Sequence, residues 1–165
     1  MLLLVLGLLV PLVASQKCSF SGSGMTARWQ VADGDLTIEF KNKNLGNNQW
    51  TGIGFGEDMS DLEVVLFEIN NFQASMVTGY TKGYSPPTLD STANVNAESI
   101  DYNSNTLVAR FTRPIGANGA RGSNLSQCGT WHFLTDGEMN DGDVGYHNTP
   151  PVSIEVCPAK CVKKN

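Results

Sequence analysis

The sequence has few residues suited to acid–base or nucleophilic catalysis. Histidine occurs only twice in 165 residues, and we find no Gly-x-Ser-x-Gly elbow, histidine-rich metal triad or dinucleotide-binding loop. Positive charge is also scarce, because 11 lysines and arginines face 16 aspartates and glutamates, which gives a formal net charge of −5. That balance argues against nucleic acid and anionic membranes as partners. We therefore expect a protein that is not an enzyme.

Long apolar runs are equally rare, since a single one occurs, at the N-terminus. The run MLLLVLGLLVPLV is too short to span a bilayer and is typical of a signal peptide. Small residues at Val13 and Ser15 predict cleavage before Gln16, so residues 1–15 are expected to be the signal peptide. We expect a secreted, extracellular protein of one domain, with no membrane span.

The four cysteines, Cys18, Cys128, Cys157 and Cys161, all follow this segment. In an oxidising compartment they predict two disulfides, with three connectivities open. One bridge is expected to tie the N-terminal segment to Cys128 or to the C-terminal pair. A four-cysteine zinc site is the alternative, although only Cys157 and Cys161 lie close together in the sequence. The sequon at Asn124 predicts a glycosylated surface loop.

The dominant hydrophobic period is two, which predicts strands. The segments LTIEF (36–40), LVARF (107–111), WHFL (131–134) and VSIEV (152–156) each alternate apolar and polar residues. Further strand candidates are RWQVA, TGIGF, LEVVLF and ASMVTGY, and turn-forming segments such as NKNLGNN, YSPPTLD and GEMNDGD separate the strands. No helical stripe of convincing length occurs. About nine short strands predict an all-β, antiparallel, immunoglobulin-like sandwich stapled by disulfides. Residues 158–165 are expected to form a C-terminal tail that is frayed after Cys161.

An ordered set of segments resembles the DOMON domain family. WQVADGDLTIEF and WTGIGFGEDMSDLEVVLF are similar to the first half of such a domain. The likeness continues through VTGYTKGYSPPTLD and LVARFTRPI to WHFLTDG and YHNTPPVS, and so covers residues 18–157. The resemblance implies a β-sandwich with a ligand pocket between its sheets, which binds haem b in some members and is proposed to bind sugars in others.

In the haem-binding members, a methionine after the GxGFG strand and a histidine near the last strand hold the iron. These positions fall on Met59 and His147. The resemblance therefore implies haem b with Met59 and His147 as axial ligands, an arrangement suited to one-electron transfer. Without the resemblance, Met59 in a polar turn would be interpreted as a surface residue or as a plug over the end of the sandwich. His147 would be interpreted as an exposed loop residue.

Three further features have competing interpretations. His132 is the other potential iron ligand, but Trp131 and Phe133 flank it on an alternating strand, so we interpret it as a structural or surface residue. Four acids follow the GxGFG strand and predict an anionic pocket rim that would favour a basic redox partner: Glu57, Asp58, Asp61 and Glu63. A second acidic set suggests calcium but lacks an EF-hand pattern: Asp136, Glu138, Asp141 and Asp143.

Two functions follow from these features. The first is a secreted haem b protein that transfers single electrons to a partner or handles haem. The second is an extracellular module that recognises a carbohydrate or another small ligand without haem, with Trp29, Trp50 or Trp131 as a stacking platform. The competing interpretation is that each tryptophan packs in the core, and we favour it for any single one of them.

Overall fold

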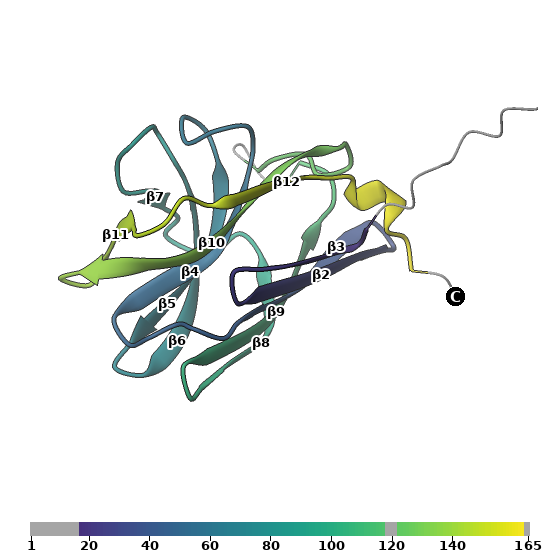
Figure 1. Ribbon diagram of the computed structural model, residues 1–165. Coiled ribbons are helices and arrows are strands. Elements are labelled where there is room, and N and C mark those ends of the chain that lie inside the picture. The colour runs from purple at the N-terminus through teal and green to yellow at the C-terminus, as the bar shows by residue number, and fades with distance from the viewer. Residues whose placement is uncertain (1–16, 118–121, 164–165) are drawn as a thin grey trace, which may run out of the picture.

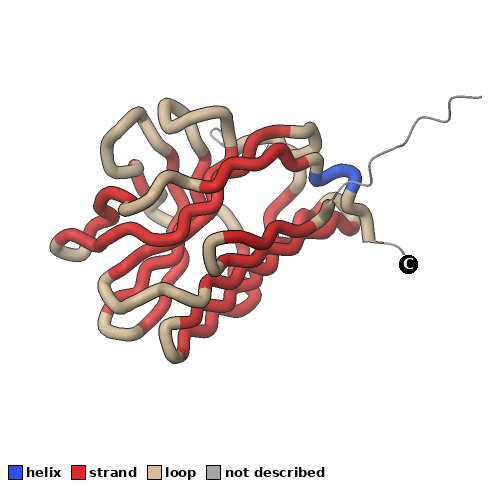
Figure 2. Tube along the Cα trace, in the orientation of Figure 1, coloured by secondary structure: helices blue, strands red, loops and turns tan. Residues whose placement is uncertain are grey.

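The computed structural model describes residues 17–117 and 122–163, and the predicted signal peptide lies outside them. The described chain forms two antiparallel sheets that face each other (Figure 1). Figure 2 shows that strands dominate, with one short helical turn near the C-terminus. The predicted antiparallel sandwich is confirmed.

The five-stranded sheet has the order β1-β2-β3-β9-β8. Its strands are β1 (Ser19–Gly22), β2 (Met25–Ala32), β3 (Asp35–Asn42), β9 (Thr106–Pro114) and β8 (Asn96–Asn103). The seven-stranded sheet has the order β11-β10-β4-β5-β6-β7, with β12 also paired to β10. Its strands are β11 (Asp143–His147), β10 (Gly129–Asn140), β4 (Gln49–Phe55), β5 (Glu63–Asn70), β6 (Gln73–Tyr80), β7 (Thr88–Leu89) and β12 (Val152–Val156).

The inward-facing residues of both sheets form an aromatic core. Trp131 on β10 packs against Trp29 on β2 with ring centroids 5.1 Å apart, and against Phe55 on β4 at 4.9 Å. All three side chains are at most 3% exposed. The predicted alternation of LTIEF is confirmed, because its apolar residues are buried whereas Glu39 is exposed. Contact between the two apolar faces holds the sheets together.

Several strands lack the pattern that sequence reasoning depends on. β8 carries the polar sequence NAESIDYN and lies at the edge of its sheet, where little of it is buried. GEMNDGD was expected to be a turn, but β10 runs through to Asn140 and β11 starts at Asp143. These strands are set by pairing with a neighbour, which hydrophobic alternation does not report.

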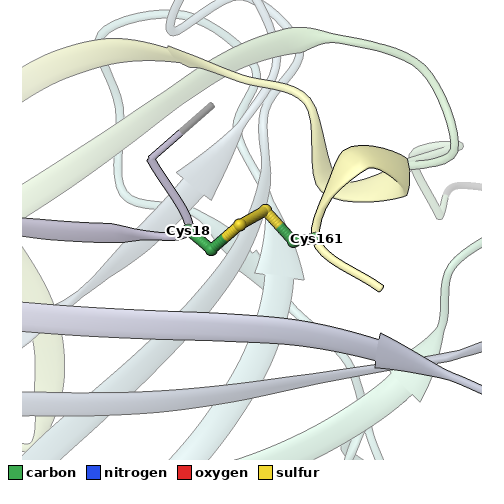
Figure 3. The surroundings of a disulfide bond; sticks show 2 residues. All are labelled: Cys18 and Cys161. Carbon is green, nitrogen blue, oxygen red and sulfur yellow. A yellow bond between two sulfur atoms is a disulfide. The ribbon is translucent and has the colours of Figure 1, made fainter. Parts of the chain in front are cut away.

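One disulfide joins the two ends of the domain, and the other links the residues that flank β10 and β12. Cys18 is bonded to Cys161 (Figure 3), and Cys128 is bonded to Cys157. The expected link between the N-terminal segment and the C-terminal pair is therefore present, and the zinc alternative is wrong for these cysteines. The short helix η1 (Pro158–Lys160) leads into Cys161.

The segment after Cys161 was expected to be frayed, but residues 162 and 163 are held by backbone pairing. The Val31 N–H of β2 donates to the carbonyl of Cys161 at 2.8 Å, and the Lys163 N–H donates to the carbonyl of Val31 at 2.9 Å. Val162 forms a parallel bridge with Val31. These backbone bonds add the C-terminal segment to the edge of the fold.

Candidate functional site

The seven-stranded sheet is apolar on its outer face as well as its inner one. On β4, Ile53 and Phe55 belong to the core between the sheets, whereas the alternate residues Trp50, Gly52 and Gly54 line a pocket on the other side. A second buried cluster covers this outer face and comprises Trp50, Leu62, Val64, Leu66, Leu134 and Val144. The apolar run VVLF (64–67) in β5 reflects this burial on both faces.

Glycines on β4 create the floor of the pocket. A Cβ at Gly52 would lie 2.4 Å from the carbonyl oxygen of Val65, and one at Gly54 would lie 3.1 Å from Leu62 Cδ1. Both glycines therefore allow β5 and Leu62 to approach β4 closely. The pocket that they line is a shallow, largely apolar depression with a cavity volume of about 80 Å³.

The lining is largely apolar and comes from the sheet and three loops around it. It consists of Trp50, Gly52, Ile53, Gly54, Met59, Leu62, Val64, Leu66, Thr81, Tyr84, Ser85, Pro86, Pro87, His132, Leu134, Gly145, Tyr146, His147 and Pro151. The expectation of a pocket between the sheets is wrong, because large aromatic side chains fill that space. Met59 and His147, although far apart in sequence, line the same pocket.

Backbone hydrogen bonds hold the turn that carries Met59. The Gly83 N–H donates to the carbonyl of Met59 at 2.8 Å, and the Thr81 N–H donates to the carbonyl of Leu62 at 2.9 Å. The Leu62 N–H donates to the hydroxyl of Thr81 at 2.8 Å. Met59 is half-buried and packs against the outer apolar cluster. The turn therefore places a thioether against the pocket wall.

His147 is positioned by an irregular stretch of β10. The register of β10 against β4 shifts between Leu134 and Gly137, and Gly137 then pairs with His147 on β11. Within this stretch, the carbonyl of Thr135 accepts a hydrogen bond from the Asn42 amide at 2.6 Å. The bulge thus ends the pairing of β10 with β12 and opens the edge to which β11 adds.

The imidazole of His147 is held in one tautomer. Its Nδ1 lies 2.9 Å from the carbonyl oxygen of Thr149. A carbonyl can only accept, so Nδ1 carries the proton and Nε2 carries the lone pair. Metal-bound histidines usually show this pattern, in which one nitrogen donates to a carbonyl and the other ligates.

His132 lines the same pocket, but both of its nitrogens are engaged. Nε2 donates to the carbonyl of Gly56 at 2.8 Å, and Nδ1 lies 2.8 Å from the hydroxyl of Ser153. Alternation correctly directs the side chain away from the core, because Trp131 and Phe133 are buried there. The outward face is a pocket wall, however, so His132 is a structural residue of the site that fixes the start of the Met59 turn.

The tryptophans divide between the core and the pocket. Trp29 and Trp131 are 3% and 1% exposed and pack together between the sheets, so neither offers a stacking surface. Trp50 is 6% exposed and lines the pocket. The sequence alone did not show that Trp50 lies in the pocket wall while the other two tryptophans lie in the core.

The acidic rim is smaller than expected. Glu57, Asp58 and Asp61 are exposed beside Met59, and hydrogen bonds from Ser60 hold the pKa of the Asp58 carboxyl below its usual value. Glu63 does not belong to the rim, because its carboxylate is buried and accepts a 2.6 Å hydrogen bond from Arg113.

Among the described residues, the four acids suggested for calcium do not form a metal-binding group. The four acids suggested for calcium lie along the β10–β11 hairpin, and among the described residues the one candidate metal group contains the Cys128–Cys157 disulfide. Asn124 is exposed and its amide oxygen accepts hydrogen bonds from Ser126, so glycosylation stays a prediction.

Comparison with known proteins agrees with this architecture. The model of the DOMON domain matches residues 21–144. The chain belongs to the DOMON family. A DOMON domain-containing protein of Caenorhabditis elegans is 30% identical over 160 residues, covering 93% of this chain and 94% of the relative. One of Caenorhabditis briggsae is 28% identical over 166 residues, covering 96% and 97%.

Two solved structures share the fold of this DOMON domain. The cytochrome domain of Myriococcum thermophilum cellobiose dehydrogenase has a TM-score of 0.64 at 10% identity, covering 84% of this chain and 77% of that one. The cytochrome b domain of Coprinopsis cinerea pyranose dehydrogenase has a TM-score of 0.57 at 12% identity, covering 82% and 78%. Within the described residues, no helix is long and apolar enough to cross a membrane.

Proposed function

We propose that this DOMON protein binds haem b in the pocket on the outer face of the seven-stranded sheet, with Met59 and His147 as axial ligands. The observation that carries the proposal is their convergence, because the two residue types that ligate low-spin haem line one apolar pocket. The fold-level likeness to two cytochrome domains supports it.

The chemistry of the pocket lining suits an apolar group that carries iron. Its walls are mostly apolar side chains, and a thioether and an imidazole lie among them. His147 presents Nε2 as its free lone pair, since Nδ1–H is engaged with Thr149. Haem iron bound by histidine and methionine exchanges one electron and has no open position for oxygen.

The proposed role is one-electron transfer or haem handling outside the cell, without catalysis on a substrate. The two disulfides agree with an oxidising, secretory compartment. Exposed acids beside Met59 would favour a partner with a basic docking face. The alternative role as a ligand-recognition module now depends on the same pocket, because Trp29 and Trp131 are buried in the core.

Absorption spectroscopy of the purified secreted protein, reconstituted with haem b, tests the proposal. We expect a six-coordinate low-spin spectrum in both oxidation states. Met59→Ala should shift the iron toward high spin and lower its reduction potential, and His147→Ala should weaken haem binding further, because imidazole is the stronger ligand for ferric iron.

Two variants serve as matched controls. Met139→Ala removes a methionine that packs on the same outer cluster without lining the pocket. His132→Gln removes the pocket imidazole but keeps a side-chain N–H for the Gly56 carbonyl. Both should keep the low-spin spectrum. If wild-type protein binds no haem, or if both ligand variants keep its spectrum, the haem proposal fails and recognition of another small ligand replaces it.

A further inference from the structure

Two tyrosines at the mouth of the pocket are largely exposed to solvent. Tyr84 is 90% exposed and Tyr146 is 69% exposed, and both line the pocket. A single exposed apolar side chain is common on protein surfaces, whereas several that gather around one depression mark an interaction site. The haem proposal uses neither tyrosine, so their exposure at this position needs another explanation.

The two segments that carry these tyrosines share a sequence design. Tyr84 lies in the loop before β7 and is followed by Pro86–Pro87, and Tyr146 lies near the end of β11 and is followed by Pro150–Pro151. Pro86, Pro87 and Pro151 also line the pocket. Proline fixes its own φ angle, so such a segment loses less conformational entropy when it binds a partner. Together these tyrosines and prolines form a preorganised apolar surface, which we call the pocket mouth.

The border of the pocket mouth is anionic. Three exposed acids flank Met59 in the neighbouring turn: Glu57, Asp58 and Asp61. No lysine or arginine occurs among the described residues that line the pocket. The Nζ of Lys82 lies 5.1 Å from the ring centroid of Tyr80, a residue that does not line the pocket. An apolar centre with a polar border is the usual anatomy of a protein–protein interface.

We propose that the pocket mouth docks a segment of a basic protein, with Tyr84 and Tyr146 as its anchors. Tyrosine is enriched among the residues that dominate binding energy at interfaces. The cavity itself is only about 80 Å³, so the exposed rim supplies most of the contact area. The inference rests on the proposed function for the sign of the partner's charge, but it does not require haem.

The acidic border selects this occupant over two others. A second copy of the chain would bring the same acids to the contact, and the chain has a formal net charge of −5, so electrostatic repulsion opposes self-association. An anionic membrane surface is repelled for the same reason. Lysine and arginine side chains of a protein partner would instead complement Glu57, Asp58 and Asp61.

Phage-displayed random peptides, selected on the purified secreted protein, test the inference. The enriched peptides should combine lysine or arginine with apolar or aromatic side chains. Tyr84→Ser/Tyr146→Ser should weaken their binding about tenfold or more, since truncated anchor residues have effects of this size. Phe72→Ser is the matched control, because Phe72 is also 69% exposed but does not line the pocket, and it should leave the affinity unchanged.

A charge test does not depend on the tyrosine variants. Glu57→Gln/Asp61→Asn should weaken peptide binding several-fold at low salt, and the difference from wild type should disappear near 1 M salt, where charges are screened within about 3 Å. Asp35→Asn/Asp101→Asn is the control, because it removes two exposed acids from the five-stranded sheet. For the wild-type protein, the affinity should fall as the salt concentration rises.

Several results would overturn the inference. These are no enrichment of peptides, enriched peptides without cations, or equal binding to wild-type protein and to Tyr84→Ser/Tyr146→Ser. Self-association, or binding to phosphatidylserine vesicles, that the tyrosine variant abolishes would assign the pocket mouth to a different occupant and would also overturn it. Reconstitution with haem b distinguishes this outcome from failure of the proposed function, because wild-type protein that binds the peptides but no haem contradicts only the haem proposal.

Discussion

The two disulfides close loops of very different length, which predicts unequal contributions to stability. Cys18 and Cys161 are 143 residues apart, and Cys128 and Cys157 are 29 apart. In the chain-entropy model, the longer closure destabilises the unfolded chain by about 5 kcal/mol and the shorter one by about 3.6 kcal/mol. The Cys18–Cys161 bond also anchors the segment that pairs with Val31, so its loss removes a tether as well as a constraint.

Replacing each pair of cysteines by alanine and unfolding the variants in urea measures these contributions. We expect Cys18→Ala/Cys161→Ala to lose more free energy of unfolding than Cys128→Ala/Cys157→Ala, by about 1.4 kcal/mol, with a larger m-value because its unfolded chain is less constrained. Non-reducing peptide mapping of the wild-type protein is the control for connectivity. A free Cys18, or a greater loss in the variant of the shorter loop, would refute the reasoning.

Three other substitutions test the site and its support. Gly54→Ala should fold, since its new methyl meets only the flexible tip of Leu62, but it should weaken haem binding in a titration by raising the pocket floor. Burial is the main cause that raises the pKa of the Glu68 carboxyl above its usual 4.5. The folded protein therefore keeps the carboxyl proton at pH values where the unfolded chain has lost it. The free energy of unfolding falls as the pH rises from the unfolded-state pKa through the folded-state pKa. Glu68→Gln should therefore raise the melting temperature at pH 7 and leave it unchanged at pH 3. Arg113→Met should cost about 3–5 kcal/mol in urea unfolding by leaving Glu63 buried without its cation, and Arg113→Met/Glu63→Leu should recover most of it.

The two candidate iron ligands came from the family resemblance, because neither residue carries a decisive local signal. Met59 is a soft, apolar residue in an acidic turn, and His147 precedes a pair of prolines in a loop. Their residue types and order match the family resemblance, which required no knowledge of distances. The location of the pocket was not predictable in the same way, since Gly52 and Gly54 lie on a strand that is buried on both faces. Alternation shows that a strand has two faces, but it does not show which face carries the site.

The same limit explains the error over Glu63 and why the partners of His132 were not predicted. Glu63 follows a run of exposed acids, and its burial depends on Arg113, which comes from the opposite sheet. His132 was correctly placed away from the core, but its partners Gly56 and Ser153 lie on either side of it only after β10 has paired with β4 and β12. Each partner is distant in sequence, so no short-range pattern identifies it.

The sequence by itself determined the class of fold and the chemistry available to it. Alternating apolar residues require two sheets packed face to face, and four cysteines after an apolar leader predict two disulfides. Tertiary structure alone decided where that chemistry is brought together. The bulge in β10 adds β11 to the sheet edge, the glycines of β4 let β5 approach closely, and three loops surround the pocket. These three features depend on strand register and on contacts between segments that are distant in the sequence. A pocket is the space that packed elements leave between them, so no local pattern in the sequence determines it.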